Sequence, residues 1–297
     1  MTVKEQYMHM KTLIFFSLLM IAMTSAPAQQ RIEIYPNGIP NSKNQSSERY
    51  QKNIPELFVY KPTTVDKHIG VLVIPGGGYA HVAIDHEGHQ VASEFARNGY
   101  TAFVLRYRLP HEEIMLDKRI GPLQDAQRAM QLIRENQKEL DVDIQKLGVL
   151  GFSAGGHLAS TLSTHYKKSY IENRAKTNLR PDFSILCYPV ISMDTTITHM
   201  GSRVNLLGRS PSNEDVELFS NELQVNKTTP PTFLMSALDD KGVVVENAYR
   251  YQAALKKHGV SNEIYTYPNG GHGFGLNNKT SEEKWMKSCL LWMSKLK

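Results

Sequence analysis

A serine between two glycines is the clearest candidate for chemistry in this sequence. Ser153 lies at the centre of the run Gly-Phe-Ser-Ala-Gly (151–155), after the apolar residues 147–150 and before a small-residue segment that can begin a helix. A serine on such a sharp strand-to-helix turn exposes its hydroxyl, and side chains two residues to either side would collide. We expect Ser153 to be a nucleophile and the Ala154 N–H to face a developing oxyanion. The alternative is a glycine-rich turn that only tightens packing.

A second glycine segment follows another apolar run. Residues 71–74 are apolar, and Pro75 leads into three consecutive glycines (76–78) and Tyr79. Consecutive glycines free the backbone to direct N–H groups inward, as the other half of an oxyanion hole requires. A phosphate-binding loop is the competing interpretation, but neither Gly-x-Gly-x-x-Gly nor Gly-Lys-Ser/Thr spacing follows.

A base and an acid stand later in the chain, in the order Ser, Asp, His. His272 lies in the glycine-rich segment 269–275, directly after the strand-like run 264–267. Asp239 and Asp240 follow the apolar run 233–235, where a strand would deliver its C-terminal loop. We favour Asp240, which stands three residues before Val243, and expect Asp239 to bond the loop backbone. The chosen aspartate would orient His272 and stabilise its imidazolium form.

Other histidines have poorer contexts for catalysis. His157 follows the serine turn and is expected to pack or to hydrogen-bond internally. His81, His86 and His89 lie close together early in the chain, but without the carboxylate–histidine arrangement of a metal site. No metal ion and no cofactor is therefore predicted.

Strands and helices alternate along most of the chain. An α/β fold follows, with a doubly wound, mostly parallel sheet and helices on both faces. Residues 191–230, rich in Ser, Thr and Asn, interrupt the alternation, and insertions of this length are usually lids or binding loops. The expected strands are 71–74, 102–105, 147–150, 184–187, 233–235 and 264–267, and the expected helices are 123–133, 244–257 and 281–295.

The N-terminus has the pattern of a secretory signal peptide. Lys11 precedes the apolar run 13–21, and Ala26-Pro27-Ala28 supplies a cleavage site. The run is about half the roughly 20 residues of a spanning helix. We expect a signal peptide over 1–28, a catalytic domain over 29–297, and an exported protein, periplasmic or secreted, with no stable membrane association after cleavage.

Charge and cysteine content set further limits. The chain has 297 residues and a formal net charge of +5, with basic and acidic residues mixed. Without a basic stripe interleaved with aromatics, nucleic-acid binding is not expected. Cys187 and Cys289 fall in apolar segments and are interpreted as buried, unpaired residues, although export would permit a disulfide.

From about Leu57 to its end, the chain resembles the α/β-hydrolase esterases of the acetyl xylan esterase and carbohydrate acetylesterase type. The resemblance rests on Pro75 to Tyr79, Asp85 to Gly88, Arg106 to Leu109, Gly151 to His157, Asp239-Asp240 and Gly270 to Phe274. It implies a serine esterase acting on small acyl esters of carbohydrates such as acetylated xylan. The implied residues are Ser153 as nucleophile, Asp240 as acid, His272 as base, and Gly77, Gly78 and Ala154 around the oxyanion.

The assignments of substrate-binding residues and of substrate rest on fewer sequence features. Val243-Val244 departs from the Val-Pro that such enzymes often have after the acid. Tyr79, His199 and Arg203 are candidate substrate-binding residues, and Glu87 is expected to brace the glycine loop. A feruloyl esterase or serine peptidase using the same triad is the close alternative, and a catalytically silent carbohydrate-binding protein is the distant one. The oligomeric state is left open.

Overall fold

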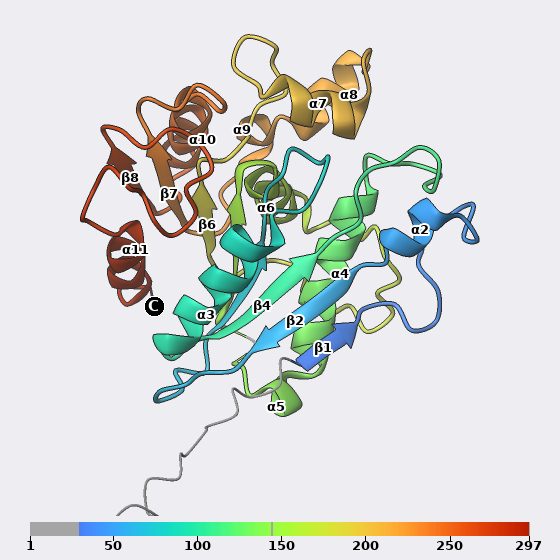
Figure 1. Cartoon of the computed structure of the whole chain (residues 1–297), viewed down its shortest axis with the longest axis horizontal. Helices are drawn as coiled ribbons and strands as arrows, with labels where there is room; N and C mark the ends of the chain where they lie inside the picture. Colours follow the sequence, from blue (N-terminus) through green and yellow to red (C-terminus); the bar gives the residue numbers. More distant parts are fainter. Residues whose placement is uncertain (1–29, 144, 297) are drawn as a thin grey trace, which may run out of the picture.

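The fold is built on one eight-stranded sheet, seen in a computed structural model that describes residues 30–143 and 145–296 (Figure 1). The strand order is β1-β2-β4-β3-β5-β6-β7-β8, and every pairing from β4 through β8 is parallel, whereas β1 and β2 pair antiparallel. This mostly parallel sheet confirms the predicted fold class. The strands are β1 (Gln30–Glu33), β2 (Glu56–Tyr60), β3 (Gly70–Ile74), β4 (Thr101–Arg106), β5 (Leu147–Phe152), β6 (Ser184–Cys187), β7 (Thr232–Ala237) and β8 (Asn262–Tyr267).

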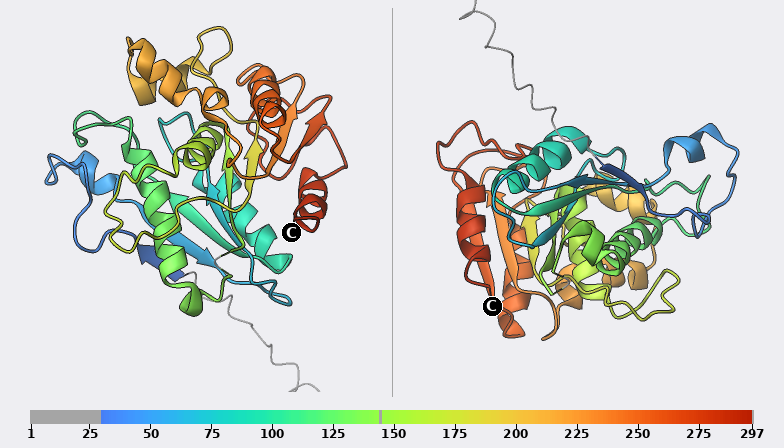
Figure 2. Two further views of the ribbon diagram at one scale, coloured as in Figure 1. Left: turned by 180° about the vertical axis from the view of Figure 1, so that it is seen from behind. Right: turned by 90° about the horizontal axis from the view of Figure 1, so that it is seen from below.

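Helices cover both faces of the sheet because the central strands are apolar on both sides. In β3, Leu72 and Ile74 pack in one layer with α4 (Gly121–Glu135), α6 (Ser153–His165) and α10 (Glu246–Lys257). Val71 and Val73 pack in the other layer with α3 (Gln90–Arg97) and α11 (Trp285–Met293). The two layers lie on opposite sides of the strands in the right-hand view of Figure 2. The helices are α2 (Glu48–Lys52), the π-helix η1 (Ile84–His89), α3 (Gln90–Arg97), α4 (Gly121–Glu135), α5 (Gln137–Leu140), α6 (Ser153–His165), α7 (Met200–Leu207), α8 (Asn213–Phe219), α9 (Asn221–Gln224), α10 (Glu246–Lys257) and α11 (Trp285–Met293).

The stretch between β6 and β7 folds into three short helices, α7 to α9, at the top of Figure 1. Side-chain caps begin two of them: His199 accepts a hydrogen bond from the Ser202 N–H at α7, and Ser212 accepts from the Asp215 N–H at α8. The buried Asn221 then ties α9 to α6 by donating to the His157 carbonyl and the Ser160 hydroxyl. The predicted insertion is thus held against the sheet's helical layer.

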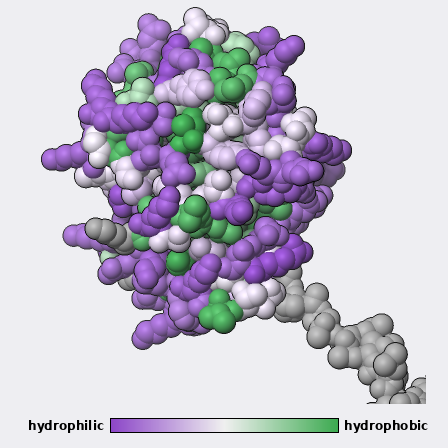
Figure 3. Space-filling model, turned by 90° about the vertical axis from the view of Figure 1, so that its left-hand side faces the viewer, coloured by the Kyte–Doolittle hydropathy of each residue, from purple (hydrophilic) through white to green (hydrophobic). Residues whose placement is uncertain are grey.

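The described part of the chain has a surface of mixed hydropathy on the face shown in Figure 3. Within the described part of the chain, no helix is long and apolar enough to cross a membrane. On the face that carries β8 and α11, hydrophobic residues are interspersed with hydrophilic ones (Figure 3). Cys187 and Cys289 are buried and unpaired, as predicted. The predicted signal peptide lies outside the described residues.

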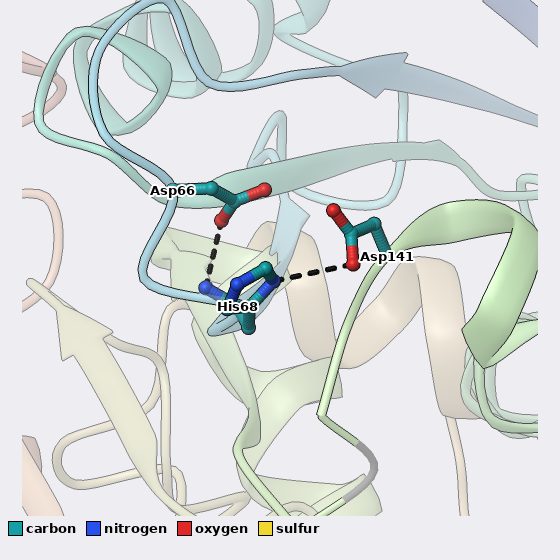
Figure 4. A group of neighbouring side chains, drawn as sticks. All are labelled: Asp66, His68 and Asp141. Carbon is teal, nitrogen blue, oxygen red and sulfur yellow. Dashed lines mark hydrogen bonds and ion pairs between the residues drawn. The ribbon is translucent and has the colours of Figure 1, made fainter.

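A cluster of Asp66, His68 and Asp141 lies at the amino ends of β3 and β5 (Figure 4). Asp66 accepts a hydrogen bond from the His68 backbone N–H at 2.7 Å, and Asp141 Oδ1 lies 3.2 Å from His68 Nδ1. Of the residues that the structure describes, this is the one group spaced to hold a metal ion, and His68 and Asp141 are exposed. These two contacts tie together the loops that lead into β3 and β5.

Candidate active site

The nucleophile candidate lies on the turn from β5 into α6. Ser153 has a positive φ of 51°, which is uncommon for a residue with a side chain. The two flanking glycines are required sterically: a Cβ on Gly151 would lie 2.2 Å from the Gly155 carbonyl oxygen, and a Cβ on Gly155 would lie 2.2 Å from the Ile74 carbonyl oxygen. The turn therefore holds Ser153 at the carboxyl edge of the sheet, where the loops after β3, β7 and β8 also meet.

Ser153, His272 and Asp240 form one hydrogen-bonded line. His272 Nε2 lies 2.8 Å from Ser153 Oγ, and His272 Nδ1 lies 2.7 Å from Asp240 Oδ2. With the imidazole donating its Nδ1–H to the carboxylate, Nε2 is free to accept the serine proton. This is the geometry of a nucleophile activated by a positioned general base.

The two adjacent aspartates have different partners. Asp240 is buried and uses Oδ1 to accept from the N–H groups of Gly242 and Val243, at 2.8 and 2.9 Å, which leaves Oδ2 for His272. Asp239 accepts from the Gly271 N–H at 2.8 Å and so bonds the backbone of the histidine loop, as the sequence suggested. Asp240 is therefore the one of the pair placed as the triad acid.

The glycine loop after β3 directs two N–H groups to one side. The Gly76 carbonyl accepts from the Ala83 N–H, and the Gly77 carbonyl accepts from the Ala80 N–H, both at 3.0 Å. Because the N–H of a trans peptide points opposite to its C=O, the N–H groups of Gly77 and Gly78 face away from these turns. Among the described residues neither N–H has an acceptor. Together with the Ala154 N–H at the start of α6, they are the donors available for an oxyanion.

A pocket of about 410 Å³ opens over these groups. His199, Gly201 and Asn205 of the α7 segment close one side of it, and Asn205 donates to the Gly78 carbonyl at 2.8 Å. Helix α7 thus contributes both to the pocket wall and to the orientation of the glycine loop. The pocket is lined by Gly77, Gly78, Ala80, His81, Ala83, His86, Glu87, Ser153, His199, Gly201, Asn205, His272 and Gly273.

His199 is held as a neutral imidazole in this pocket. Its Nδ1 accepts from the Ser202 backbone N–H at 3.2 Å, so the proton of the neutral ring is on Nε2. Burial lowers the pKa of His199 from its usual value, and nearby His272 lowers that pKa further. No described residue is a hydrogen-bond partner of Nε2, which leaves one N–H donor for a bound molecule.

Two of the expected substrate-binding residues point elsewhere, which corrects the expectation from the sequence. Tyr79 is buried and its hydroxyl donates to His157 Nδ1 at 2.8 Å, while His157 Nε2 donates to the Phe219 carbonyl. Arg203 uses its Nε to donate to the Met193 carbonyl at 3.0 Å. Neither Tyr79 nor Arg203 lines the pocket, because each side chain is directed to a structural partner. His157 has the internal hydrogen-bonding role expected of it.

Sequence reasoning missed Asn205 and Tyr188. Asn205 comes six residues after His199, and its role depends on how α7 docks, which no periodicity indicates. Tyr188 directly follows β6, beside the strand that carries Ser153, so the carboxyl-edge rule for parallel sheets could have marked it. Glu87, in contrast, does brace the glycine loop, because Oε2 accepts from the Gly76 N–H at 2.8 Å.

Fold and site together define an α/β hydrolase with a serine–histidine–aspartate triad. The BD-FAE family model matches residues 57–255, which is more than half of the chain. The chain belongs to this family of α/β-hydrolase esterases.

Several relatives are similar over most of the chain. An acetylxylan esterase of Xylanibacter ruminicola is 36% identical over 69% of this chain and 41% of its own length. Endo-1,4-beta-xylanase B of Butyrivibrio fibrisolvens is 38% identical over 78% of this chain and 36% of its own length. The chain thus spans about two fifths of these curated relatives. A solved acetyl ester-xyloside bifunctional hydrolase of Caldicellulosiruptor lactoaceticus matches with a TM-score of 0.78 and 38% identity, over 89% of this chain and 95% of that one.

Proposed function

We propose that this protein is an exported serine esterase that removes small acyl groups, acetyl above all, from plant-type polysaccharides or oligosaccharides such as acetylated xylan. The observation that carries the proposal is the aligned Ser153, His272 and Asp240 beneath an open pocket. The alcohol part of the substrate is suggested by relatives whose names refer to acetylxylan and to an acetyl ester-xyloside.

The proposed reaction proceeds through an acyl-enzyme. His272 Nε2 takes the Ser153 proton while Oγ attacks the ester carbonyl, and Asp240 stabilises the imidazolium that forms. The N–H groups of Gly77, Gly78 and Ala154 stabilise the tetrahedral oxyanion. His272 then protonates the departing alcohol, and water hydrolyses the acyl-serine by the same route. No step requires a metal ion or an organic cofactor.

His199 is our candidate for contacting the alcohol portion. Its Nε2–H faces the pocket and stays in place because Nδ1 is occupied by the first turn of α7. A neutral N–H donor suits the hydroxyl and ring oxygens of a sugar.

Product analysis on defined esters tests the substrate assignment. Purified protein is incubated with acetylated xylo-oligosaccharides and, separately, with feruloylated arabinoxylan fragments, and released acetate and ferulate are quantified. We expect acetate release to exceed ferulate release in kcat/KM. Preferential ferulate release would indicate a feruloyl esterase, and cleavage of peptides without ester hydrolysis would indicate a peptidase.

Export is a separate element of the proposal. The N-terminal mass of the protein recovered from the producing cell's periplasm or medium should correspond to a chain that begins at Gln29. A full-length chain retained in the cytoplasm would contradict export without affecting the esterase assignment.

A further inference from the structure

We propose that Glu87 and Tyr188 are positioning residues that link the oxyanion loop to the loop of the catalytic histidine. The inference rests on the proposed function, since it concerns the same site. Both side chains are buried, with 2% and 0% of their surface exposed. Neither residue takes part in the proton transfers described above, so their polar contacts need another explanation.

Glu87 faces the oxyanion loop from the π-helix η1. The helix sets this position: the Gln90 N–H bonds the Asp85 carbonyl five residues back, and the Glu87 N–H bonds the Ala83 carbonyl. Glu87 Oε2 then accepts from the Gly76 N–H at 2.8 Å. Gly76 precedes the two glycines whose N–H groups face the pocket, so this bond fixes the first peptide of the oxyanion loop.

Tyr188 faces the histidine loop from the end of β6. Its hydroxyl oxygen accepts from the Gly275 N–H at 2.9 Å, three residues after His272. Its ring also packs edge-on against the His272 ring, with centroids 4.9 Å apart. The backbone of Tyr188 is itself fixed, because its N–H bonds the Met235 carbonyl of β7. One side chain therefore supports both the backbone and the imidazole of the histidine loop.

The two residues meet through a single hydrogen bond. The Tyr188 hydroxyl donates to Glu87 Oε1 at 2.8 Å. Burial raises the pKa of Tyr188 well above its usual value, as does the neighbouring Glu87, so the hydroxyl keeps the proton that it donates. The path from loop to loop is then complete: Gly275 N–H to Tyr188, Tyr188 O–H to Glu87, and Gly76 N–H to Glu87.

All donors along this path point toward the carboxylate. The Gly76 N–H can only donate. The Tyr188 hydroxyl oxygen accepts from the Gly275 N–H, and its own proton is directed to Glu87. A carboxylate accepts both bonds, one on each oxygen. A glutamine cannot, because its amide nitrogen would face either the Gly76 N–H or the Tyr188 hydroxyl, and either arrangement leaves a buried donor unpaired. Position 87 therefore requires a side chain with two hydrogen-bond acceptor oxygens, which glutamate has and glutamine lacks.

Catalysis needs both loops in register, because the serine oxygen must meet His272 on one side and the N–H donors on the other. Sites of this kind are held to about 0.5 Å by supporting hydrogen bonds. Breaking the link should displace the two loops relative to each other while leaving the pocket open to substrate. Loss of kcat with little change in KM is therefore expected.

Glu87→Gln, Tyr188→Phe and the double variant test the inference, with Tyr267→Phe as matched control. Tyr267 is also a buried tyrosine whose hydroxyl accepts from a backbone N–H, that of Trp285, and donates to a backbone carbonyl, that of Glu283. Its loss should lower thermal stability as much as the loss of the Tyr188 hydroxyl. The partners of the Tyr267 hydroxyl lie in neither the oxyanion loop (76–78) nor the histidine loop (269–275), so kcat of Tyr267→Phe should stay near the wild-type value.

We expect kcat on p-nitrophenyl acetate to fall about 10-fold to 100-fold in each single variant, a range comparable to losing part of an oxyanion-hole donor. The kcat of the double variant should be no lower than that of the less active single variant, because either change breaks the same path. Independent effects that multiply in the double variant would contradict the linkage.

Amide hydrogen exchange supplies a readout that does not depend on ester hydrolysis. Glu87→Gln should speed exchange in residues 270–277, to which Glu87 is linked by the Tyr188 hydroxyl, as well as in residues 75–83. Tyr267→Phe should leave exchange in 75–83 unchanged. Unaltered exchange in 270–277 together with wild-type kcat in Glu87→Gln overturns the inference. If Glu87→Gln speeds exchange in both segments but the wild-type protein shows no esterase activity, the linkage is supported and the proposed function is refuted.

Discussion

At the scale of the residue, the neighbouring aspartates give a sharp test of the triad. Asp240→Asn would place an amide against His272 Nδ1 and favour the wrong tautomer, so we expect kcat to fall by about 10³-fold to 10⁴-fold. Asp239→Asn keeps an oxygen that can accept from the Gly271 N–H, and kcat should change by less than about threefold, as for a near-neutral hydrogen-bond replacement. Steady-state kinetics on p-nitrophenyl acetate measures both. Equal losses in the two variants would contradict the assignment of Asp240.

His199 carries the second prediction at this scale. Replacing it by asparagine keeps a side-chain N-cap for α7 but is too short to place a donor where Nε2–H lies, so kcat/KM on an acetylated xylo-oligosaccharide should fall about 3-fold to 10-fold, as expected for one hydrogen bond. The value on p-nitrophenyl acetate, which has no sugar, should change little. Arg203→Ala is the control on the same helix, because that side chain bonds the Met193 carbonyl outside the pocket. An equal effect on both esters would show that His199 does not contact the sugar.

At the scale of the element, helix α7 matters through its contact with the glycine loop. Asn205→Ala removes the donor that holds the Gly78 carbonyl, and the adjoining peptide gains freedom. We expect kcat to fall about 10-fold, less than for complete loss of an oxyanion donor. Met200→Ala, at an exposed position of the same helix, should leave kcat unchanged. If Asn205→Ala behaves like Met200→Ala, α7 forms only a wall of the pocket.

Elements differ in how far the sequence predicts them. Strands such as β3 and β5 are continuous apolar runs, so the sheet was predictable. The turn that carries Ser153 was predictable as well, because its flanking glycines are sterically required. The helices of 191–230 were not, because their positions depend on polar contacts, such as those of Asn221 with α6, that leave no periodic pattern. For the same reason the sequence favoured Tyr79 for substrate, whereas its hydroxyl is used by His157.

At the scale of the whole molecule, the buried His157 should make stability depend on pH. Burial lowers the pKa of His157 from 6.5 to about 4. Between these values the unfolded chain binds a proton that the folded protein does not, so stability is complete above about pH 6.5 and is lost as the pH falls toward 4. The loss from this one group should reach about 3 kcal/mol.

Urea unfolding at several pH values measures this loss. His157→Gln carries no titrating group there, so its free energy of unfolding should fall less steeply between pH 7 and pH 4 than that of the wild type. His258→Gln, at an exposed position, should keep the wild-type dependence. If His157→Gln and wild type show the same slope, His157 is not the group responsible.

The central claim is that Ser153 becomes acylated in an ester hydrolysis assisted by His272. A pre-steady-state assay with p-nitrophenyl acetate, followed by peptide mass analysis of acid-quenched protein, tests it most directly. We predict a burst of one nitrophenolate per chain, one acetyl group on the peptide that contains Ser153, and neither in a folded Ser153→Ala variant. Acetylation elsewhere, or undiminished turnover by Ser153→Ala, would contradict the account.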